Sequence, residues 1–313
     1  MAELNGILCI DKPAGFTSFD VVAKMRGIAK TRKIGHAGTL DPMATGVLPL
    51  FLGRATKACD ILPRQDKKYL ATFQLGLTTD TQDSTGTVLS RSPVTVGKAQ
   101  VRAAAARFVG EIMQLPPMYS AVKVDGQRLY ELARKGVQVE RKARKIVIYS
   151  LEFTECNDIE HTYQIQVHCS KGTYIRTLIA DIGEALGCGA VMTALRRTMA
   201  AGYVLEECIT LAQAQQLADA GELGSQRLGA PLMPIGSAFT SLPRVFLGKS
   251  QARLFCNGVR LDAQRIQITR QGKPLLPEQV QGHLEVVSNK EFLGVAQLVQ
   301  GELRLVKLFT LEE

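Results

Sequence analysis

Alternating apolar and polar side chains mark two strands of the chain most clearly. Residues 68–75 and 162–169 each place apolar side chains at every second position, with mostly polar residues between them. Successive side chains of a strand point to opposite faces, so each segment predicts a strand with one buried face. The apolar positions are Tyr69, Ala71, Phe73 and Leu75 in the first segment, and Tyr163, Ile165, Val167 and Cys169 in the second.

Apolar residues at helical spacing mark three other segments. Thr17 stands three residues before Asp20, which is the spacing of a capping box, and this pair predicts the start of a helix. Residues 98–109 predict a second helix. A third is predicted from about Thr173, after a Ser-Lys-Gly turn, to a stop near Gly187.

The order of these elements indicates the fold class. Residues 6–10 and 146–153 predict further strands, and no regular βαβ rhythm appears, so we expect an α+β protein. Residues 1–230 would form a mixed, mainly antiparallel sheet with flanking helices. Prolines punctuate residues 231–244, which predict a linker. Residues 245–313 contain short strand-like runs with turn residues between them, and they predict a small β-rich domain.

The composition is typical of a soluble globular protein. Of the 313 residues, 46% are hydrophobic and 21% are charged, so the chain can bury a sizeable core. No apolar run approaches the length of about 18 residues that crosses a membrane. The first residues also lack the basic and then apolar stretches of a secretory signal. We therefore expect a cytoplasmic protein.

The cysteines and histidines predict no metal site. The nearest pair of the seven cysteines is Cys156 and Cys169, which excludes C-x-x-C redox pairs and the short ligand spacings of common zinc modules. The four histidines show no H-E-x-x-H spacing. An odd number of scattered cysteines predicts reduced, mostly buried thiols.

The charge indicates a polyanionic partner. The net charge is +9, and basic residues concentrate in residues 128–145 and at Arg196 and Arg197. Positive charge attracts nucleic acids by releasing their counterions. A basic but merely solvated surface explains the composition equally well. No long amphipathic basic helix favours a membrane surface.

A glycine-rich loop at residues 34–46 is the most unusual segment. Asp41 is the only acidic residue between Asp20 and Asp60, an interval that holds seven lysines and arginines. A carboxylate in such a field should stay ionised and could act as a nucleophile or base. On local features alone, Asp41 fits a turn before Pro42 better than a catalytic group, and His36 fits an ordinary loop histidine better than a functional one.

Residues 35–46, Gly-His-Ala-Gly-Thr-Leu-Asp-Pro-Met-Ala-Thr-Gly, resemble the signature of the TruB family, bacterial pseudouridine synthases that modify the T-loop of tRNA. Further segments similar to the family follow in family order. They are residues 5–15, 52–57, 66–69, 117–121, 169–177 and 195–197. The resemblance covers most of residues 5–210, and it implies a catalytic domain in residues 1–230. Residues 245–313 resemble the family's small PUA-like RNA-binding domain in position and size.

The resemblance implies a reaction and its catalytic residues. The bond between ribose C1′ and uracil N1 breaks, the base rotates, and it is rejoined through C5, so no cofactor is implied. Asp41 matches the catalytic nucleophile, Arg176 matches the arginine that pairs with it, and Tyr69 matches the tyrosine that stacks on the target base. Without the resemblance, Arg176 fits a helix surface and Tyr69 fits a core position.

Three more positions match residues that hold the RNA, and a fourth, Lys12, is a candidate for contact with phosphate. The target base must flip out of the folded RNA into a protein pocket. Tyr174 and Leu195 match residues that line this pocket, although both also fit plain packing. His36 matches the residue that fills the space left by the base. Lys12 is expected to contact phosphate.

The implied partner is tRNA, bound through its T-loop and stem by a monomer that needs no protein partner and no membrane. A non-catalytic tRNA-binding or tRNA-folding protein would share the basic surface. A guide-RNA-dependent pseudouridine synthase would share the site. A metal-dependent hydrolase lacks ligands. Asp41, Tyr69 and Arg176 together favour the stand-alone enzyme.

Overall fold

The computed structural model describes residues 4–224, 231–289 and 291–310. The chain divides into two compact units. Unit 1 combines Met1–Asp41, Val47–Gln65 and Ala201–Glu313, and unit 2 combines Pro42–Gly46 and Asp66–Ala200. Unit 2 is therefore an insertion in the chain of unit 1. Within the described residues, no helix is long and apolar enough to cross a membrane.

Unit 2 is built on a sheet whose strands are mainly antiparallel. Strand β4 is central, between β12 and β11, and β10 and β7 follow on the β11 side. The first two residues of β3 pair with β12 in parallel. Strand β3 (Thr45–Leu52) begins in unit 2 and continues into unit 1. The strands that lie wholly in unit 2 are β4 (Lys67–Leu75), β7 (Gly110–Gln114), β10 (Arg144–Asn157), β11 (Thr162–Cys169) and β12 (Ala190–Ala200).

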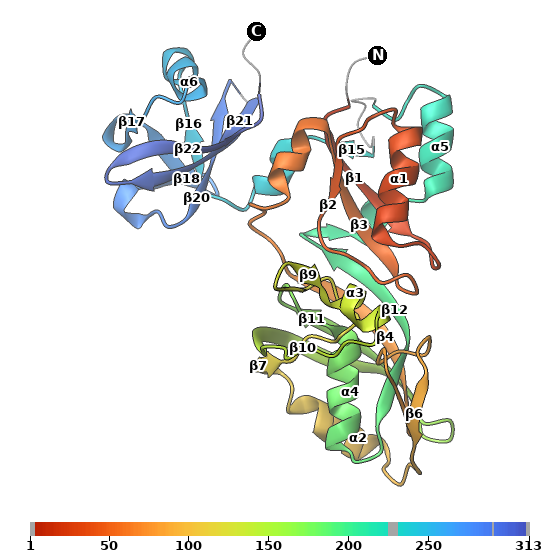
Figure 1. The fold of residues 1–313 in the computed structure, drawn as a ribbon. Coiled ribbons are helices and arrows are strands. Elements are labelled where there is room, and N and C mark those ends of the chain that lie inside the picture. Colours follow the sequence, from red (N-terminus) through yellow and green to blue (C-terminus); the bar gives the residue numbers. More distant parts are fainter. Residues whose placement is uncertain (1–3, 225–230, 290, 311–313) are drawn as a thin grey trace. The chain divides into compact units, whose positions relative to one another are not determined.

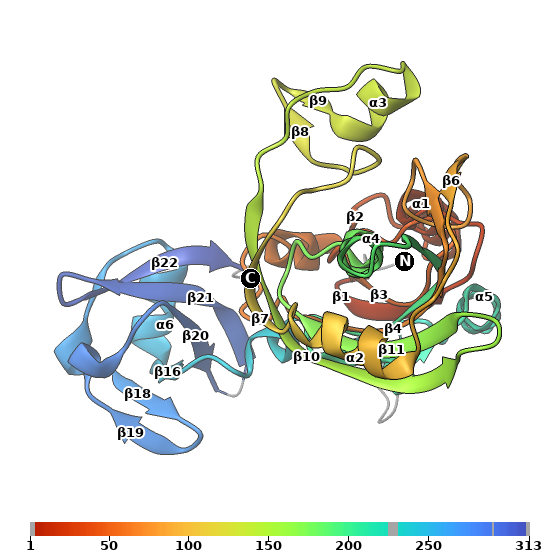
Figure 2. The ribbon, with the colours of Figure 1, turned by 90° about the horizontal axis from the view of Figure 1, so that it is seen from below.

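Helices and small hairpins complete unit 2. Helix α4 (Ile175–Ala185) packs against β12 and β4, and α2 (Lys98–Ala106) packs against β10 and α4. The hairpin of β8 (Lys123–Val124) and β9 (Gln127–Arg128) and the short helix α3 (Leu129–Arg134) form an extension beyond the sheet (Figure 2). A second hairpin joins β5 (Leu77–Thr79) and β6 (Val88–Arg91).

Unit 1 begins with a strand and a capped helix. Helix α1 (Ser18–Ile28) starts as predicted, because the Asp20 amide donates to Thr17 Oγ1 at 3.0 Å and the Thr17 amide donates to the Asp20 carboxylate at 2.8 Å. Strand β1 (Gly6–Lys12) pairs in parallel with β14 (Cys208–Ile209). Other elements here are β2 (Ile34–His36), β13 (Tyr203–Val204), α5 (Leu211–Asp219), β15 (Leu232–Met233) and the 3-10 turns η1 (Gly53–Ala58), η2 (Leu205–Glu207) and η3 (Ile235–Phe239).

Two helices cover the unit 1 strands on one side. Apolar residues of α1 and α5 pack with those of β1 and β3 in one buried cluster. Figure 1 shows the two helices next to each other beside these strands. The cluster joins the first 52 residues of the chain to residues that follow the whole of unit 2. The members that are fully buried are Leu8, Ile10, Val21, Met25, Leu48, Leu50, Leu52 and Ala214.

The C-terminal part of unit 1 is a small, mainly antiparallel sheet with its own apolar core. Its order is β17-β22-β21-β20-β16-β18-β19, and α6 (Lys249–Cys256) packs against β17 and β22. The strands are β16 (Arg244–Phe246), β17 (Leu261–Asp262), β18 (Gln267–Arg270), β19 (Lys273–Leu275), β20 (His283–Ser288), β21 (Glu291–Val299) and β22 (Glu302–Leu308), and the 3-10 turns are η4 (Ala263–Arg265) and η5 (Pro277–Gln279).

The predicted α+β class is confirmed, with its mainly antiparallel sheet, flanking helices and β-rich C-terminal part. The predicted helix at 98–109 is too long, because α2 ends at Ala106 and Gly110 opens β7 with a φ of 102°. The domain limits 1–230, 231–244 and 245–313 stay a prediction. Residue 230 lies outside the described residues.

Candidate active site

The glycine-rich loop that contains Asp41 is anchored to α1. The Leu40 amide donates to Ser18 Oγ at 2.8 Å, and the Ser18 hydroxyl donates to the Leu40 carbonyl at 3.2 Å. The Leu40 side chain is buried. Asp41 follows directly and is partly exposed. These bonds fix the backbone just before the carboxylate, which suits a group that must act in one position.

His36 begins the same loop at the end of β2. It lies opposite Leu50 of β3, and the next residue, Ala37, donates its amide to the Pro49 carbonyl at 3.1 Å. Gly38 has a φ of 85°, a conformation that favours glycine. His36 and Asp41 thus lie on one loop, which hydrogen bonds at Ala37 and Leu40 attach to other residues of unit 1.

Beyond Asp41 the chain passes into unit 2. Thr45 and Gly46 pair with Arg196 and Arg197 of β12, and Arg196 Nη1 donates to Thr45 Oγ1 at 3.2 Å. A Cβ atom on Gly46 would lie 2.2 Å from the Arg197 carbonyl oxygen. Only glycine permits this approach of the two backbones. Strand β12 therefore holds the far end of the loop.

Tyr69 and Leu195 lie on one face of the unit 2 sheet. Tyr69 of β4 is opposite Arg197 of β12, and Ala71, two residues later, is opposite Leu195. Paired residues share a face, so Tyr69 and Leu195 are diagonal neighbours. Both are buried, with 5% and 7% of their surface exposed. The structure brings these two predicted site residues together.

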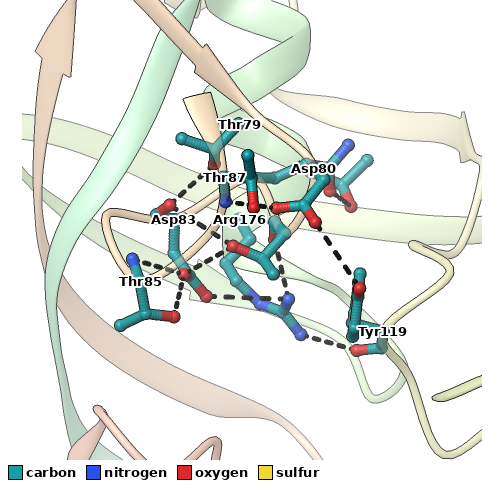
Figure 3. A network of polar contacts seen from close by, with 10 residues as sticks. Thr79, Asp80, Asp83, Thr85, Thr87, Tyr119 and Arg176 are labelled. Atoms are coloured by element: carbon teal, nitrogen blue, oxygen red, sulfur yellow. Dashed lines mark hydrogen bonds and ion pairs between the residues drawn. The ribbon is translucent and has the colours of Figure 1, made fainter. Parts of the chain in front are cut away.

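Arg176 lies in the first turn of α4, as predicted, and is buried in a polar network (Figure 3). Its guanidinium donates to the Thr81 carbonyl at 2.8 Å and to the Tyr119 carbonyl at 2.9 Å. An Asp83 carboxylate oxygen lies 3.7 Å from Nη1. A planar guanidinium with several fixed partners loses its freedom to rotate, so Arg176 is held in one orientation.

Asp83 organises the loop that holds Arg176. Its carboxylate accepts hydrogen bonds from the Thr81 hydroxyl at 2.8 Å, and from the Thr85 amide at 3.0 Å and hydroxyl at 2.6 Å. The Thr79 hydroxyl donates to the Asp83 carbonyl at 2.7 Å (Figure 3). The loop therefore folds around a buried carboxylate, which was not among the sites predicted from the sequence. The Thr-Thr-Asp-Thr-Gln-Asp-Ser-Thr-Gly run is a turn signal that could have found it.

Tyr174 is positioned by Gln114, a buried residue at the end of β7. The Tyr174 amide donates to Gln114 Oε1 at 2.8 Å, and Gln114 Nε2 donates to the Tyr174 carbonyl at 3.1 Å. Tyr174 is the residue before the first turn of α4. The reciprocal pair therefore fixes the start of the helix that carries Arg176.

Positive charge concentrates beside Tyr69. Lys67 stands two residues before Tyr69 on β4 and so points to the same face. Burial, and then the nearby Arg197 guanidinium, lowers the pKa of Lys67 to about 8. Arg197 itself is fully buried, so it does not belong to a basic surface as the sequence suggested. The lowered pKa of Lys67 therefore reflects mainly its burial, with a smaller effect of the neighbouring cation.

Lys12 is fully buried, and its ammonium donates to the carbonyls of Pro13 and Phe16. These bonds hold the turn that leads into α1. A contact of Lys12 with phosphate stays a prediction. Among the described residues, no group of three or more His, Cys, Asp or Glu side chains is placed to hold a metal ion.

Comparison with known proteins gives the family. A family model described as "TruB family pseudouridylate synthase (N terminal domain)" matches residues 26–175, and one described as "tRNA pseudouridylate synthase B C-terminal domain" matches residues 176–240. The tRNA pseudouridine synthase B of Pseudomonas putida is 44% identical over 299 residues, which cover 95% of this chain and 92% of that protein. The chain belongs to the TruB family.

Other TruB relatives agree. The tRNA pseudouridine synthase B of Ralstonia pickettii is 46% identical over 264 residues, which cover 84% of this chain and 81% of that protein. Among solved structures, a chain in "Crystal Structure of a Cbf5-Nop10-Gar1 Complex" is 27% identical with a TM-score of 0.74. This match covers 98% of this chain and 85% of that chain. The likeness thus extends past residue 240, where the TruB family models end.

The predicted TruB residues fall into two groups. Lys12, His36 and Asp41 belong to unit 1, and Tyr69, Tyr174, Arg176 and Leu195 belong to unit 2. Local bonds fix the backbone or side chain of most of these residues. Their catalytic and binding roles stay predictions.

We expect Asp83→Ala to destabilise this TruB chain by about 3 kcal/mol, because it removes a buried carboxylate that lies 3.7 Å from Arg176 Nη1 and accepts hydrogen bonds from Thr81 and Thr85. Activity should fall at least about tenfold, since the guanidinium loses its orientation. Urea unfolding and single-turnover rates measure the two effects. Asp80→Ala is the matched control: Asp80 is exposed and accepts from the Thr87 amide, so its loss should cost less than about 1 kcal/mol. Equal effects of the two variants would contradict the assignment.

Proposed function

We propose that this chain isomerises the T-loop uridine of tRNA to pseudouridine. The proposal rests above all on the 44% identity, over 95% of the chain, to a protein named tRNA pseudouridine synthase B. Two features of the site support it. Hydrogen bonds hold the backbone next to Asp41, and they also hold the Arg176 guanidinium in one orientation. The enzyme works as a cytoplasmic monomer without a protein partner.

Asp41 is the nucleophile in this proposal. The C1′–N1 bond breaks, a C1′–C5 bond forms, C5 loses its proton and N1 gains one, so the product has the composition of the substrate. Asp41 adds covalently to the ribose or the base, or assists loss of the C2′ proton, and is released at the end. Arg176 orients the carboxylate through charge-assisted hydrogen bonds. Tyr69 stacks on the uracil and takes the C5 proton.

The target base reaches these groups by flipping out of the folded RNA. Unstacking costs on the order of a few kcal/mol, and contacts to the flipped base offset this cost. Tyr69, Tyr174 and Leu195 line the uracil pocket in this proposal. His36 stacks in the space that the base leaves.

Pseudouridine mapping on an unmodified tRNA transcript tests the function. The purified chain alone should convert the T-loop uridine and leave a transcript with cytidine at that position unmodified. A second candidate, guide-dependent modification, has support from the likeness to a chain of the Cbf5-Nop10-Gar1 complex. Conversion only after adding guide RNA and partner proteins would favour that candidate. Tight tRNA binding without conversion would leave a binding or folding protein.

Two exposed cations near the start of β10 should contact phosphate. Lys142 and Arg144 are exposed, whereas Arg141 donates to the Pro116 carbonyl at 2.8 Å and Lys145 pairs with Glu111 at 2.7 Å. Each lost phosphate contact lowers the slope of log K against log salt by about 0.7 to 0.9.

We therefore expect the double variant Lys142→Ala with Arg144→Ala to lower the salt slope of tRNA binding by about 1.5. Filter binding over a series of salt concentrations measures it. Lys145→Ala serves as the control and should change the slope less, because its ammonium already has a carboxylate partner. An unchanged slope in the double variant would mean that these cations only face solvent.

A further inference from the structure

Two cysteines far apart in the sequence lie directly opposite each other in unit 1. Cys9 of β1 and Cys208 of β14 are partners in a parallel pair of strands. Cys9 is fully buried, whereas Cys208 is partly exposed. Both are reduced. Among the described strands, no other two cysteines lie opposite each other on neighbouring strands.

The spacing of paired strands suits a disulfide. Neighbouring strands lie about 4.7 to 4.9 Å apart, and disulfides join residues whose Cα atoms are about 4.4 to 6.8 Å apart. Residues opposite each other in a sheet also direct their side chains to the same face. Oxidation of this pair therefore requires little movement of the backbone.

The Cys9 thiol is affected by its neighbour Cys208. The neighbouring Cys208, and then burial, raises the pKa of the Cys9 thiol well above its ordinary value. The Cys208 thiol also lies within 3.5 Å of the Val204 carbonyl, to which it can donate. The more accessible sulfur of the pair belongs to Cys208.

We propose that Cys9 and Cys208 form an oxidation site that reacts with hydrogen peroxide to give a reversible disulfide. The Cys208 sulfur attacks the peroxide O–O bond, which yields a sulfenic acid and water. The Cys9 sulfur then attacks the Cys208 sulfur, hydroxide leaves, and it takes the Cys9 proton to form a second water. Two thiols and one hydrogen peroxide thus become one disulfide and two waters.

The crosslink would close a loop that contains the whole of unit 2. Residues 42–46 and 66–200 all lie between Cys9 and Cys208 in the sequence. A disulfide stabilises a fold mainly by restricting the unfolded chain, and the effect grows with the length of the closed loop. Oxidation should therefore raise the Tm by about 5 °C, and a reductant should reverse the rise.

Treatment of the native chain with hydrogen peroxide, followed by alkylation and peptide mass spectrometry without reduction, tests the site. The expected result is a crosslinked peptide pair containing Cys9 and Cys208 and a loss of two free thiols. Cys208→Ser should abolish the crosslink and the rise in Tm. Cys156→Ser is the matched control, because Cys156 is also partly exposed but lies opposite Tyr163.

Two outcomes would overturn the proposal. One is that Cys208 accumulates as sulfenic or sulfinic acid while Cys9 stays a free thiol, which is then detected in its alkylated form. The other is an equal loss of thiols in wild type and Cys208→Ser. Because the crosslink is detected in the wild-type chain itself, the test holds even if a variant folds poorly.

Discussion

Asp41→Asn is expected to reduce pseudouridine formation at least about 10⁴-fold, with tRNA affinity within about threefold of wild type. Without its nucleophile, the enzyme cannot form the covalent intermediate, and rate losses of this size or larger are usual. An amide has nearly the shape of a carboxylate but is a far weaker nucleophile. The hydrogen bonds between the Leu40 backbone and the Ser18 hydroxyl do not involve the Asp41 side chain, so the loop should keep its conformation.

Single-turnover assays with excess enzyme and mapping of the modified base give the rate, and filter binding gives the affinity. Asp60→Asn is the matched control. It removes a carboxylate from the same basic stretch, but the Asp60 side chain is 66% exposed and pairs with Lys307, so turnover should stay near that of wild type. An Asp41→Asn rate within tenfold of wild type would refute the role of the carboxylate.

Gly46→Ala is expected to lower the free energy of unfolding by more than about 3 kcal/mol. A left-handed conformation alone costs a non-glycine residue about 1 to 2 kcal/mol, and Gly46 has a φ of 103°. The larger cost comes from the new Cβ, which would lie 2.2 Å from the Arg197 carbonyl oxygen. The pairing of β3 with β12 must then open, and Tyr69 lies on the other side of Arg197. Activity should fall with stability.

Gly15→Ala separates the two contributions. Gly15 has a φ of 81°, but no atom lies within 4 Å of the position of its Cβ. This variant therefore has the backbone strain without the collision, and we expect a loss of about 1 kcal/mol. Urea unfolding of both variants measures the difference. Equal losses at the two positions would show that β12 yields to the methyl group and that the close approach is not needed.

Local patterns predicted the elements that one short stretch of sequence determines. The capping residues Thr17 and Asp20 gave the start of α1, and clean alternation gave β4 and β11. Strands β3 and β12 were missed. Pro49 lies inside β3 and argues against a central strand, and two bulges in the pairing of β12 with β4 break the period of two on which the prediction depends.

In the candidate site, too, local patterns predicted some residues and missed others. Asp41 stood out by its charge and its glycine-rich surroundings, but its role came from the family resemblance. The Arg176 network depends on Thr81, Asp83 and Tyr119, which lie far from Arg176 in the sequence. Single-sequence patterns carry no signal for such a contact. Arg197 was misjudged because a pair of arginines suggests a surface, and only the register of β12 shows that it is buried.

The insertion of unit 2 into unit 1 has a consequence for biosynthesis. Strand β1 and helix α1 leave the ribosome early, but their partners β14 and α5 are translated only after residue 200. At a translation rate of about 5 to 20 residues per second, β14 and α5 are synthesised about 10 to 40 s after β1 and α1. A chain that stops before α5 should aggregate. It lacks Leu211 and Ala214, so the apolar cluster of unit 1 stays incomplete and exposed to solvent. We therefore expect nascent chains of this protein to depend on chaperones that shield early apolar segments.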